Sequence, residues 1–356
     1  MLPNRGTYVP TLAVRASEMR GLEFLPAVSK ARMMPLFLLA PWFNSKTLDR
    51  TIERIERAYP RRLYFLDIDR DYIPKDAENS LAQAEWLELR DPSGHFEAWR
   101  SFCMKFPALI PCLQVAGQDQ HDLRAQVEKC QENEREFCWR IELTRMPPNI
   151  QTVVDILIEI GTADFSIVIE GGWVEDPLTL YARTHGMLTG LLSDLDGRIP
   201  IVVSCTSMPK GFSHIVGVED TPFSNHQLLD DLRRDTNRDN LLFGDWGSTR
   251  PREDSFGQAP FPRIDYATND SWHFSRNRDG NWGYREAARA IIERPVWDGE
   301  LGIWGEDMIR DTARTPDFAI DTPQKNIASR VNIHLHRQAL YGDNIHGLDL
   351  DEDWID

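Results

Sequence analysis

The sequence predicts an α/β protein, a (β/α)8 TIM-like barrel with a C-terminal aromatic-rich extension. The first observation comes from residues 137–172, where two short apolar runs, FCWRIELTR and DFSIVIEGG, flank a segment whose apolar residues recur at helical spacing. Strands that are joined by a crossover helix run parallel in one sheet. The second observation is that eight such strands fit into the first 245 residues, as a barrel of this class requires.

The predicted strands are rich in β-branched and aromatic residues, and helical patterns fill the gaps between them. The strands are expected at 8–15, 34–40, 62–69, 109–115, 137–144, 164–170, 199–206 and 241–245. The helices of this region are expected at 16–31, 48–58, 81–89, 95–106, 122–134, 150–161, 178–195 and 225–234. An open doubly wound sheet also alternates in this way, but no Gly-rich phosphate motif follows the first strand. The count of eight strands therefore favours the barrel.

The alternation stops after Asp245, which suggests two units. We expect the barrel over 1–250, and an irregular and helical extension over 251–356 that packs on the barrel and ends in an acidic tail, LDLDEDWID. Within it, residues 250–282 are rich in Pro, Asp, Asn, Arg and aromatic side chains, the pattern of a long ordered excursion. Helices are expected at 284–292, 308–314 and 324–340.

Composition limits the partners and the compartment. The net charge of −16 argues against non-specific binding to nucleic acid, because contacts to phosphates need a basic surface. No run approaches the roughly 18 apolar residues of a membrane span, and MLPNRGTYVP lacks the apolar region of a signal peptide. The five cysteines form no CxxC pair and are predicted to be reduced thiols. We therefore expect a cytoplasmic protein.

Candidate functional residues follow from the strand ends, because barrels of this class work at the carboxyl ends of their strands. The two-residue period of a strand turns alternate side chains to the same face. Applied to each strand, it turns one set of polar side chains inward: Arg15, Asp67, Asp69, Gln114, Arg140, Glu142, Glu170, Ser204 and Asp245.

Converging carboxylates suggest an acid–base pair or a cation site. We predict Glu142, Glu170 and Asp245 as catalytic acids and bases, with two inward arginines among them, Arg15 and Arg140. Asp67 and Asp69 are the candidate ligands of a divalent cation, Mg or Mn. The structural alternative is that the arginines and acids are ion pairs that fill a polar interior. A one-residue slip in register would turn all these side chains toward the helices.

Weaker candidates lie in the loops after the last strands. Ser204 and Lys210 flank the loop after the seventh strand, where many barrels bind phosphate, although SCTSMPKG is not a P-loop. Trp246 follows the eighth strand in FGDWGS. These three residues are the predicted substrate-binding side chains. His334 and His336 are two apart on a predicted helix and therefore do not share a helical face, so His334 is assigned to the core.

Four stretches resemble the beta family proteins of bacteria, phages and mobile elements. They are YVPTLAVRASEMRGLEFL followed by MMPLF, then FGDWGS, and the late ASRVNIHLHRQAL. The resemblance runs from Tyr8 to about Gly342. It implies a phage or mobile-element context, and it brings no catalytic residues to this chain.

Two function classes fit these residues. The first is a hydrolase of an anionic, phosphate-ester-like substrate, assisted by a metal. The second is a non-enzymatic sensor or protein-interaction scaffold in phage–host conflict, including antiviral defence, since a fold alone does not imply catalysis. The expected partner is a small anionic ligand or a protein. Solvent-reachable carboxylates favour the enzyme, whereas a mouth covered by residues 250–282, with each acid paired to an arginine, favours the scaffold.

Overall fold

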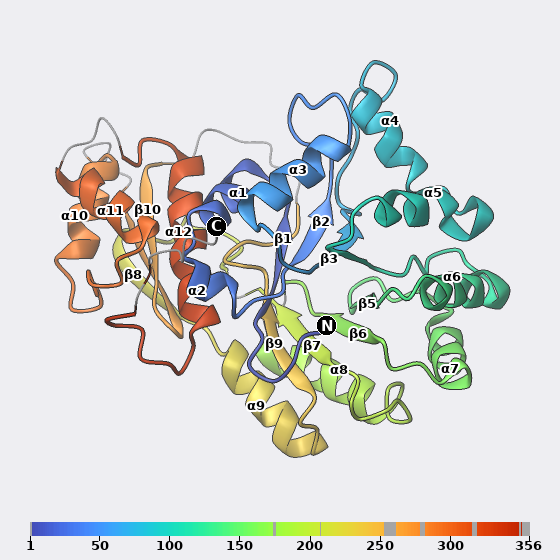
Figure 1. The fold of residues 1–356 in the computed structure, drawn as a ribbon. Coiled ribbons are helices and arrows are strands. Elements are labelled where there is room, and N and C mark those ends of the chain that lie inside the picture. The colour runs from blue at the N-terminus through green and yellow to red at the C-terminus, as the bar shows by residue number, and fades with distance from the viewer. Residues whose placement is uncertain are drawn as a thin grey trace.

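Eight parallel strands form a sheet that is nearly closed into a barrel (Figure 1). The computed structural model describes residues 2–173, 176–206, 208–252, 261–277, 282–314, 319–348 and 350. In it the sheet has the order β4-β3-β2-β1-β9-β7-β6-β5. Its strands are β1 (Val9–Ala13), β2 (Leu36–Leu39), β3 (Tyr64–Ile68), β4 (Leu109–Pro111), β5 (Phe137–Glu142), β6 (Phe165–Glu170), β7 (Ile201–Cys205) and β9 (Leu241–Asp245). Each falls within a predicted strand, so the barrel prediction is confirmed.

The junction between β4 and β5 closes the barrel with few backbone contacts. A single parallel bridge joins Cys112 to Cys138, and the Leu113 amide donates to the Cys138 carbonyl at 2.8 Å. The neighbouring pair β5 and β6 is in register over six residues, from Phe137 with Phe165 to Glu142 with Glu170. Closure at the β4–β5 junction therefore relies more on side chains than the rest of the sheet does.

Helices cover the outside of the barrel (Figure 1). They are α1 (Ala16–Glu23), α2 (Ala27–Lys30), α3 (Asp49–Ala58), α4 (Leu81–Glu88), α5 (Ser93–Met104), α6 (Gln120–Glu132), α7 (Ile150–Ile160), α8 (Pro177–Thr189) and α9 (Asn225–Thr236). The prediction of one helix over 16–31 is wrong: Pro26 has extended backbone and separates α1 from α2, because proline has no amide to continue the helix.

The sheet packs on both of its faces. The outer face meets the helices through large apolar residues such as Trp139, Ile141 and Phe243. The inner face is a smaller apolar cluster, which includes Val168, Leu242 and Trp246. Burial of both faces explains why the strands are near-continuous apolar runs in the sequence, as expected for parallel strands.

A second, antiparallel sheet was not expected from the sequence. It has the order β10-β11-β8 and comprises β8 (Gly217–Pro222), β10 (Arg263–Ala267) and β11 (Ser271–Arg276). Helices α10 (Tyr284–Ile292), α11 (Trp304–Arg314) and α12 (Pro323–Ala339) pack with it around a separate apolar cluster. β8 belongs to the stretch before residue 250 yet pairs with β11. The division of the chain at residue 250 stays a proposal.

Helix α12 joins the extension to the barrel by packing on α1 (Figure 1). A Cβ at Gly21 would lie 2.7 Å from the Ala328 carbonyl oxygen, so only glycine allows this approach. The Asn332 side-chain amide donates to the Gly21 carbonyl at 2.9 Å, and Ser29 Oγ lies 2.8 Å from His336 Nδ1. Within the described residues, no helix is both long and apolar enough to cross a membrane.

The buried His336 should make stability depend on pH. Burial, followed by the charge of Arg337, lowers the pKa of His336 to about 4. The unfolded chain therefore binds a proton below about pH 6.5 that the folded chain does not bind until about pH 4, and stability falls as the pH falls. We expect this group to cost about 2 kcal/mol of unfolding free energy between pH 7 and pH 5. Urea unfolding of wild type and His336→Gln at both pH values checks this, and equal pH dependence in the two proteins would contradict it.

Candidate functional site at the barrel mouth

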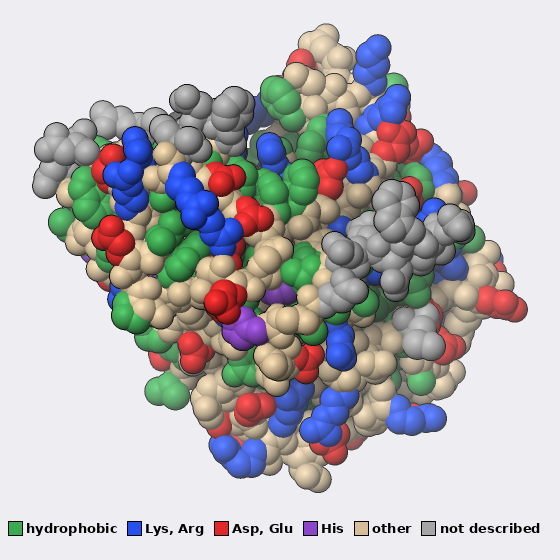
Figure 2. Space-filling view, turned by 60° about the vertical axis from the view of Figure 1, so that its left-hand side comes forward, with side chains coloured by type: hydrophobic (Ala, Val, Ile, Leu, Met, Phe, Trp, Pro, Cys, Tyr) green, Lys and Arg blue, Asp and Glu red, His purple; other side chains and the backbone are tan. Residues whose placement is uncertain are grey.

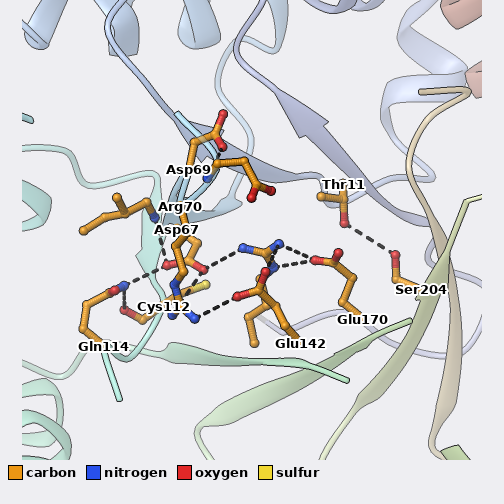
Figure 3. A network of polar contacts seen from close by, with 12 residues as sticks. Thr11, Asp67, Asp69, Arg70, Cys112, Gln114, Glu142, Glu170 and Ser204 are labelled. Carbon is orange, nitrogen blue, oxygen red and sulfur yellow. Dashed lines mark hydrogen bonds and ion pairs between the residues drawn. The ribbon is translucent and has the colours of Figure 1, made fainter. Parts of the chain in front are cut away.

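The carboxyl ends of β3, β5 and β6 place three carboxylates around one arginine inside the barrel. Glu142 and Glu170 are partners in the register of β5 and β6. Arg140 lies two residues before Glu142 and so faces the same way. Asp67 comes from β3, beyond the β4–β5 junction, and all four residues are buried. Figure 3 shows the carboxylates of Asp67, Glu142 and Glu170 turned toward a common centre.

Arg140 contacts all three acids. Its Nε lies 2.6 Å from Glu170 Oε2, its Nη1 lies 3.1 Å from Asp67 Oδ2, and its Nη2 lies 3.3 Å from Glu142 Oε1. Hydrogen bonds between ionised groups are stronger than those between neutral groups, and the planar guanidinium can donate to several carboxylates at once. These three acids and Arg140, which the sequence places together, do form one cluster.

Three further polar side chains donate hydrogen bonds to the acids of the cluster. Arg70 Nη1 donates to Glu142 Oε2 at 2.8 Å, and Gln114 Nε2 donates to Asp67 Oδ1 at 2.7 Å. The indole of Trp246 donates to Glu170 Oε1 at 3.2 Å. The cluster of three acids and two arginines has a formal charge of −1 when all are ionised, so it holds one more carboxylate than it can neutralise.

The pKa values of the acids are pushed apart. Burial and the nearby Glu142 raise the pKa of Glu170, and Arg140 offsets only part of this. Burial alone would raise the pKa of Asp67 too, but Arg70 and Arg140 lower it below its ordinary value. Burial alone would lower the pKa of Arg140, yet the three surrounding acids raise it. Arg140 therefore stays charged, and Glu170 holds a proton more readily than Asp67 does.

Asp69 lies just beyond β3 and is not part of the cluster. Arg252 Nε contacts its Oδ2 at 2.5 Å, and the Asp71 amide donates to its Oδ1 at 3.2 Å. The predicted cation ligands Asp67 and Asp69 thus point to different partners, both of them cationic. A cation could bind both carboxylates only after Arg140 and Arg252 had moved, because like charges repel.

The structure does not bring Asp245 into the cluster, so this part of the predicted convergence is wrong. Asp245 Oδ2 lies 2.5 Å from His334 Nε2, and Oδ1 accepts the Tyr8 hydroxyl and the Gly247 amide, the latter at 2.7 Å. The reason is that neighbouring residues of a strand face opposite sides, and Gly244 is the residue that faces inward. A Cβ at Gly244 would lie 2.6 Å from Val202 Cγ1. Asp245 therefore turns outward toward α12, and His334 is buried in the core as predicted.

Arg15 lies at the mouth but apart from the cluster. It borders a cleft of 480 Å³ at the carboxyl ends of β1, β2 and β3. Its Nη1 lies 3.4 Å from Glu18 Oε1 and its Nη2 lies 3.5 Å from the Arg250 carbonyl, while its buried Nε has no hydrogen-bond partner among the described residues. Its side chain is 31% exposed. The cleft walls include Trp42, Phe43, Asn44, Ser45, Tyr72, Asp76, Gln83 and Arg252.

The aromatic walls of this cleft were not predicted from the sequence. Trp42 and Phe43 lie three and four residues after the end of β2, and this position beyond a strand end was the available signal. Tyr72 and Arg252 come from loops whose contact cannot be read from local patterns; the Arg252 guanidinium lies 5.6 Å from the centre of the Tyr72 ring. A larger hollow of 590 Å³ lies at the opposite, amino-terminal ends of β3, β4 and β5, away from the end at which barrels of this class work.

The predicted substrate-binding residues do not line the cleft, and Trp246 contacts the cluster through Glu170. Ser204 faces inward on β7, with its Oγ 3.5 Å from Thr11 Oγ1, and Figure 3 shows this pair beside Glu170. Lys210 lies in the loop after β7, with its ammonium 5.3 Å from the centre of the Trp173 ring. Trp246 is fully buried and acts as a donor to Glu170 rather than as a surface platform.

Comparison with known proteins identifies the family. The family model described as Beta protein matches residues 8–340. The chain belongs to this family. It is also similar to Protein beta of Enterobacteria phage P4, with 27% identity over 98% of this chain and 97% of that protein. A phage protein thus aligns with almost all of this sequence.

A solved structure with some likeness is the carboxyl transferase domain of Rhizobium etli pyruvate carboxylase with pyruvate and biocytin. It shares 8% identity at a TM-score of 0.35, covering 94% of this chain and 48% of that one. A likeness at this level carries no argument about the function of the present chain.

Removal of Arg140 should destabilise the protein strongly. Arg140→Met leaves three acids buried without their shared cation, and breaking a buried ion pair costs about 3–5 kcal/mol. The matched control is Arg198→Met, because Arg198 also pairs with an acid, Asp196, but is 82% exposed. Urea unfolding at pH 7 should give a loss below about 1 kcal/mol for that control. Equal losses in the two variants would show that Arg140 does not hold the cluster.

Glu170→Gln should weaken the pH dependence of stability. Because the folded pKa of Glu170 is raised, the folded chain holds this proton at pH values where the unfolded chain has released it. The wild type therefore loses stability as the pH rises from about 4.5 through the folded pKa of Glu170. The glutamine variant lacks this contribution, so its stability relative to wild type should increase across the same window. Urea unfolding between pH 4.5 and pH 8 measures it, and parallel curves would refute the raised pKa.

Proposed function

We propose that this beta family protein is a non-enzymatic binding scaffold whose barrel mouth receives a small anionic ligand. The observation that carries the proposal is the pairing of acids at the mouth. Asp67, Glu142 and Glu170 share Arg140, and Asp69 pairs with Arg252. Carboxylates held in this way are not free to act as bases or to ligate a cation, because either role would leave Arg140 or Arg252 without its anionic partner.

The cleft beside Arg15 supports the choice of ligand. Two guanidinium groups, of Arg15 and Arg252, stand beside the rings of Trp42, Phe43 and Tyr72. Guanidinium groups bind phosphate and carboxylate, and aromatic rings stack on flat ligands. The cleft therefore suits an anion that carries a planar ring, such as a nucleotide. Figure 2 shows basic and acidic side chains interspersed on the face it presents, without a continuous basic stripe for a nucleic acid strand.

The biological setting is part of the same proposal. The relative in phage P4 supports a role in phage–host conflict, as a sensor or a protein-interaction scaffold and with antiviral defence among its forms. The five cysteines are free and buried, as predicted, which supports a reducing compartment and hence the cytoplasm.

Hydrolysis of a phosphate-ester-like substrate is the second candidate. One observation favours it: the pKa of Glu170 is raised, and a carboxyl group that keeps its proton in this way can serve as a general acid. Glu142 and Arg140 would then contact the substrate, and Asp67 with Asp69 would hold Mg or Mn. This arrangement requires Arg140 and Arg252 to leave their present partners, so we rank it second.

Thermal shift measurements test the binding proposal. Inorganic phosphate and a panel of nucleoside mono-, di- and triphosphates are added to wild type, to Arg15→Ala and to Arg50→Ala. Arg50 is the matched control because it is an exposed arginine on α3 that pairs with Glu53. A ligand at 100 times its Kd stabilises by about 2.7 kcal/mol. For a chain of this size we expect a rise in Tm of several degrees in wild type and Arg50→Ala, and a much smaller one in Arg15→Ala.

Two outcomes would contradict the scaffold. If no member of the panel shifts Tm, or if Arg15→Ala responds like wild type, the cleft does not bind such anions. If wild type instead converts a phosphate ester to product in the presence of Mn, and Glu170→Gln abolishes turnover while remaining folded, the second candidate is correct.

A further inference from the structure

Three metal-ligating side chains meet on the outside of the barrel, away from the mouth cluster. His95 lies at the start of α5, and His121 and Asp122 lie in the first turn of α6. His95 Nδ1 is 2.5 Å from Asp122 Oδ1, and the rings of His95 and His121 are 5.1 Å apart. One ligand atom from each residue lies within 4.8 Å of the other two.

The backbone at His95 directs its imidazole toward α6. Gly94, His95 and Phe96 all have left-handed backbone, with φ of 60°, 60° and 57°, a conformation that residues other than glycine rarely adopt. Arg100 holds the turn: its Nη2 donates to the Gly94 carbonyl at 2.8 Å and its Nε to the His95 carbonyl at 3.0 Å. Phe96 is buried beneath it. His95 is therefore held in place before any ligand binds.

Asp122 is positioned from the other side by the cap of α6. The Asp122 amide donates to Asp119 Oδ1 at 2.9 Å, so the carboxylate of Asp119 is used in capping. The side chain of Asp122 stays free to face His95. Ligand atoms of a tetrahedral site with bonds of 2.0–2.2 Å lie roughly 3.3 Å apart. His121 is exposed and can reach this spacing by rotation of its side chain. His95 Nδ1 and Asp122 Oδ1, which are 2.5 Å apart, would separate to the same spacing when the metal takes the place of the proton between them.

The donor set selects the metal. Two imidazole nitrogens and one carboxylate oxygen suit zinc and the neighbouring first-row metals, whereas Mg and Ca prefer oxygen ligands alone. The side chains of His95 and Asp122 are 31% and 29% exposed, which leaves room for water in a fourth position. Three protein ligands with one open position is an arrangement that zinc accepts.

We propose that His95, His121 and Asp122 form a zinc site that ties the start of α5 to the start of α6. These helices flank β4, whose contact with β5 is a single bridge between Cys112 and Cys138. A metal bound here cross-links the two helices beside the β4–β5 junction. The simpler interpretation, a hydrogen bond between His95 and Asp122, leaves His121 without a role in the group.

Isothermal titration with Zn²⁺ alone tests the site. We expect one strong binding event in wild type, and affinity at least about tenfold weaker in His121→Ala and in Asp122→Asn, since each loses a ligand. The matched control is His214→Ala. His214 is also an exposed histidine beside an acid, with Nε2 3.1 Å from Glu219 Oε1, but within the described residues it belongs to no group of three ligands.

Co²⁺ titration and thermal unfolding give independent measurements. Wild type and His214→Ala should develop the visible absorption of cobalt held by nitrogen and oxygen ligands, and Zn²⁺ should raise their Tm. His121→Ala should show neither effect, and because His121 is exposed, this variant is expected to fold. Binding of similar strength in wild type and His121→Ala, or no binding by wild type, would overturn the proposal.

Discussion

One buried guanidinium organises the mouth of this barrel. Arg140 joins acids from β3, β5 and β6, and Glu170 in turn accepts a hydrogen bond from Trp246 beyond β9. These contacts cross the interior and span the β4–β5 junction, where backbone pairing is sparse. Taking charged groups out of water is costly, so the buried acids of the cluster depend on Arg140 as their shared cation. The closed shape of the barrel and the chemistry of its mouth therefore depend on the same residue.

The pairing of these buried charges also distinguishes the two candidate functions. An acid–base mechanism needs a carboxylate that can exchange its proton with a substrate, and Glu170, whose pKa is raised, is the candidate in the cluster. It lies deep in the barrel and is held by Arg140 and Trp246. The cleft beside Arg15 is more open and carries both cationic and aromatic groups. Recognition at the cleft requires no rearrangement of the interior, whereas catalysis in the cluster does.

The barrel was predictable because each of its strands can be recognised from its own local sequence. Parallel strands that are buried on both faces are apolar runs, and each one was found from such a run. Arg140, Glu142 and Glu170 were found because large apolar residues, among them Trp139 and Ile141, define the opposite face. The direction of Asp245 was predicted wrongly because LLFGD has apolar residues on both faces. Which face turns inward follows from the close contact of Gly244 with Val202, which local sequence does not reveal.

The antiparallel sheet could not be found in the same way. β8, with the sequence GVEDTP, alternates between half-buried and exposed residues and reads as a polar loop. β10 and β11 contain arginine, aspartate and histidine whose partners lie far away in sequence, such as the Asp265 carboxylate with Arg330 on α12. The pairings Asp69 with Arg252 and Asp245 with His334 are equally distant. Local patterns carry no information on such contacts, because tertiary packing alone brings the residues together.

The docking of α12 on α1 has a consequence for synthesis on the ribosome. Gly21 and Asn332, which meet in the folded protein, are 311 residues apart in the chain. At ordinary rates of translation, α12 follows α1 by roughly 15 to 60 seconds. All eight barrel strands precede α12, so the nascent barrel can form while the face of α1 that contains Gly21 is still uncovered. In this interval, the growing chain exposes this helix face to chaperones and to other nascent chains.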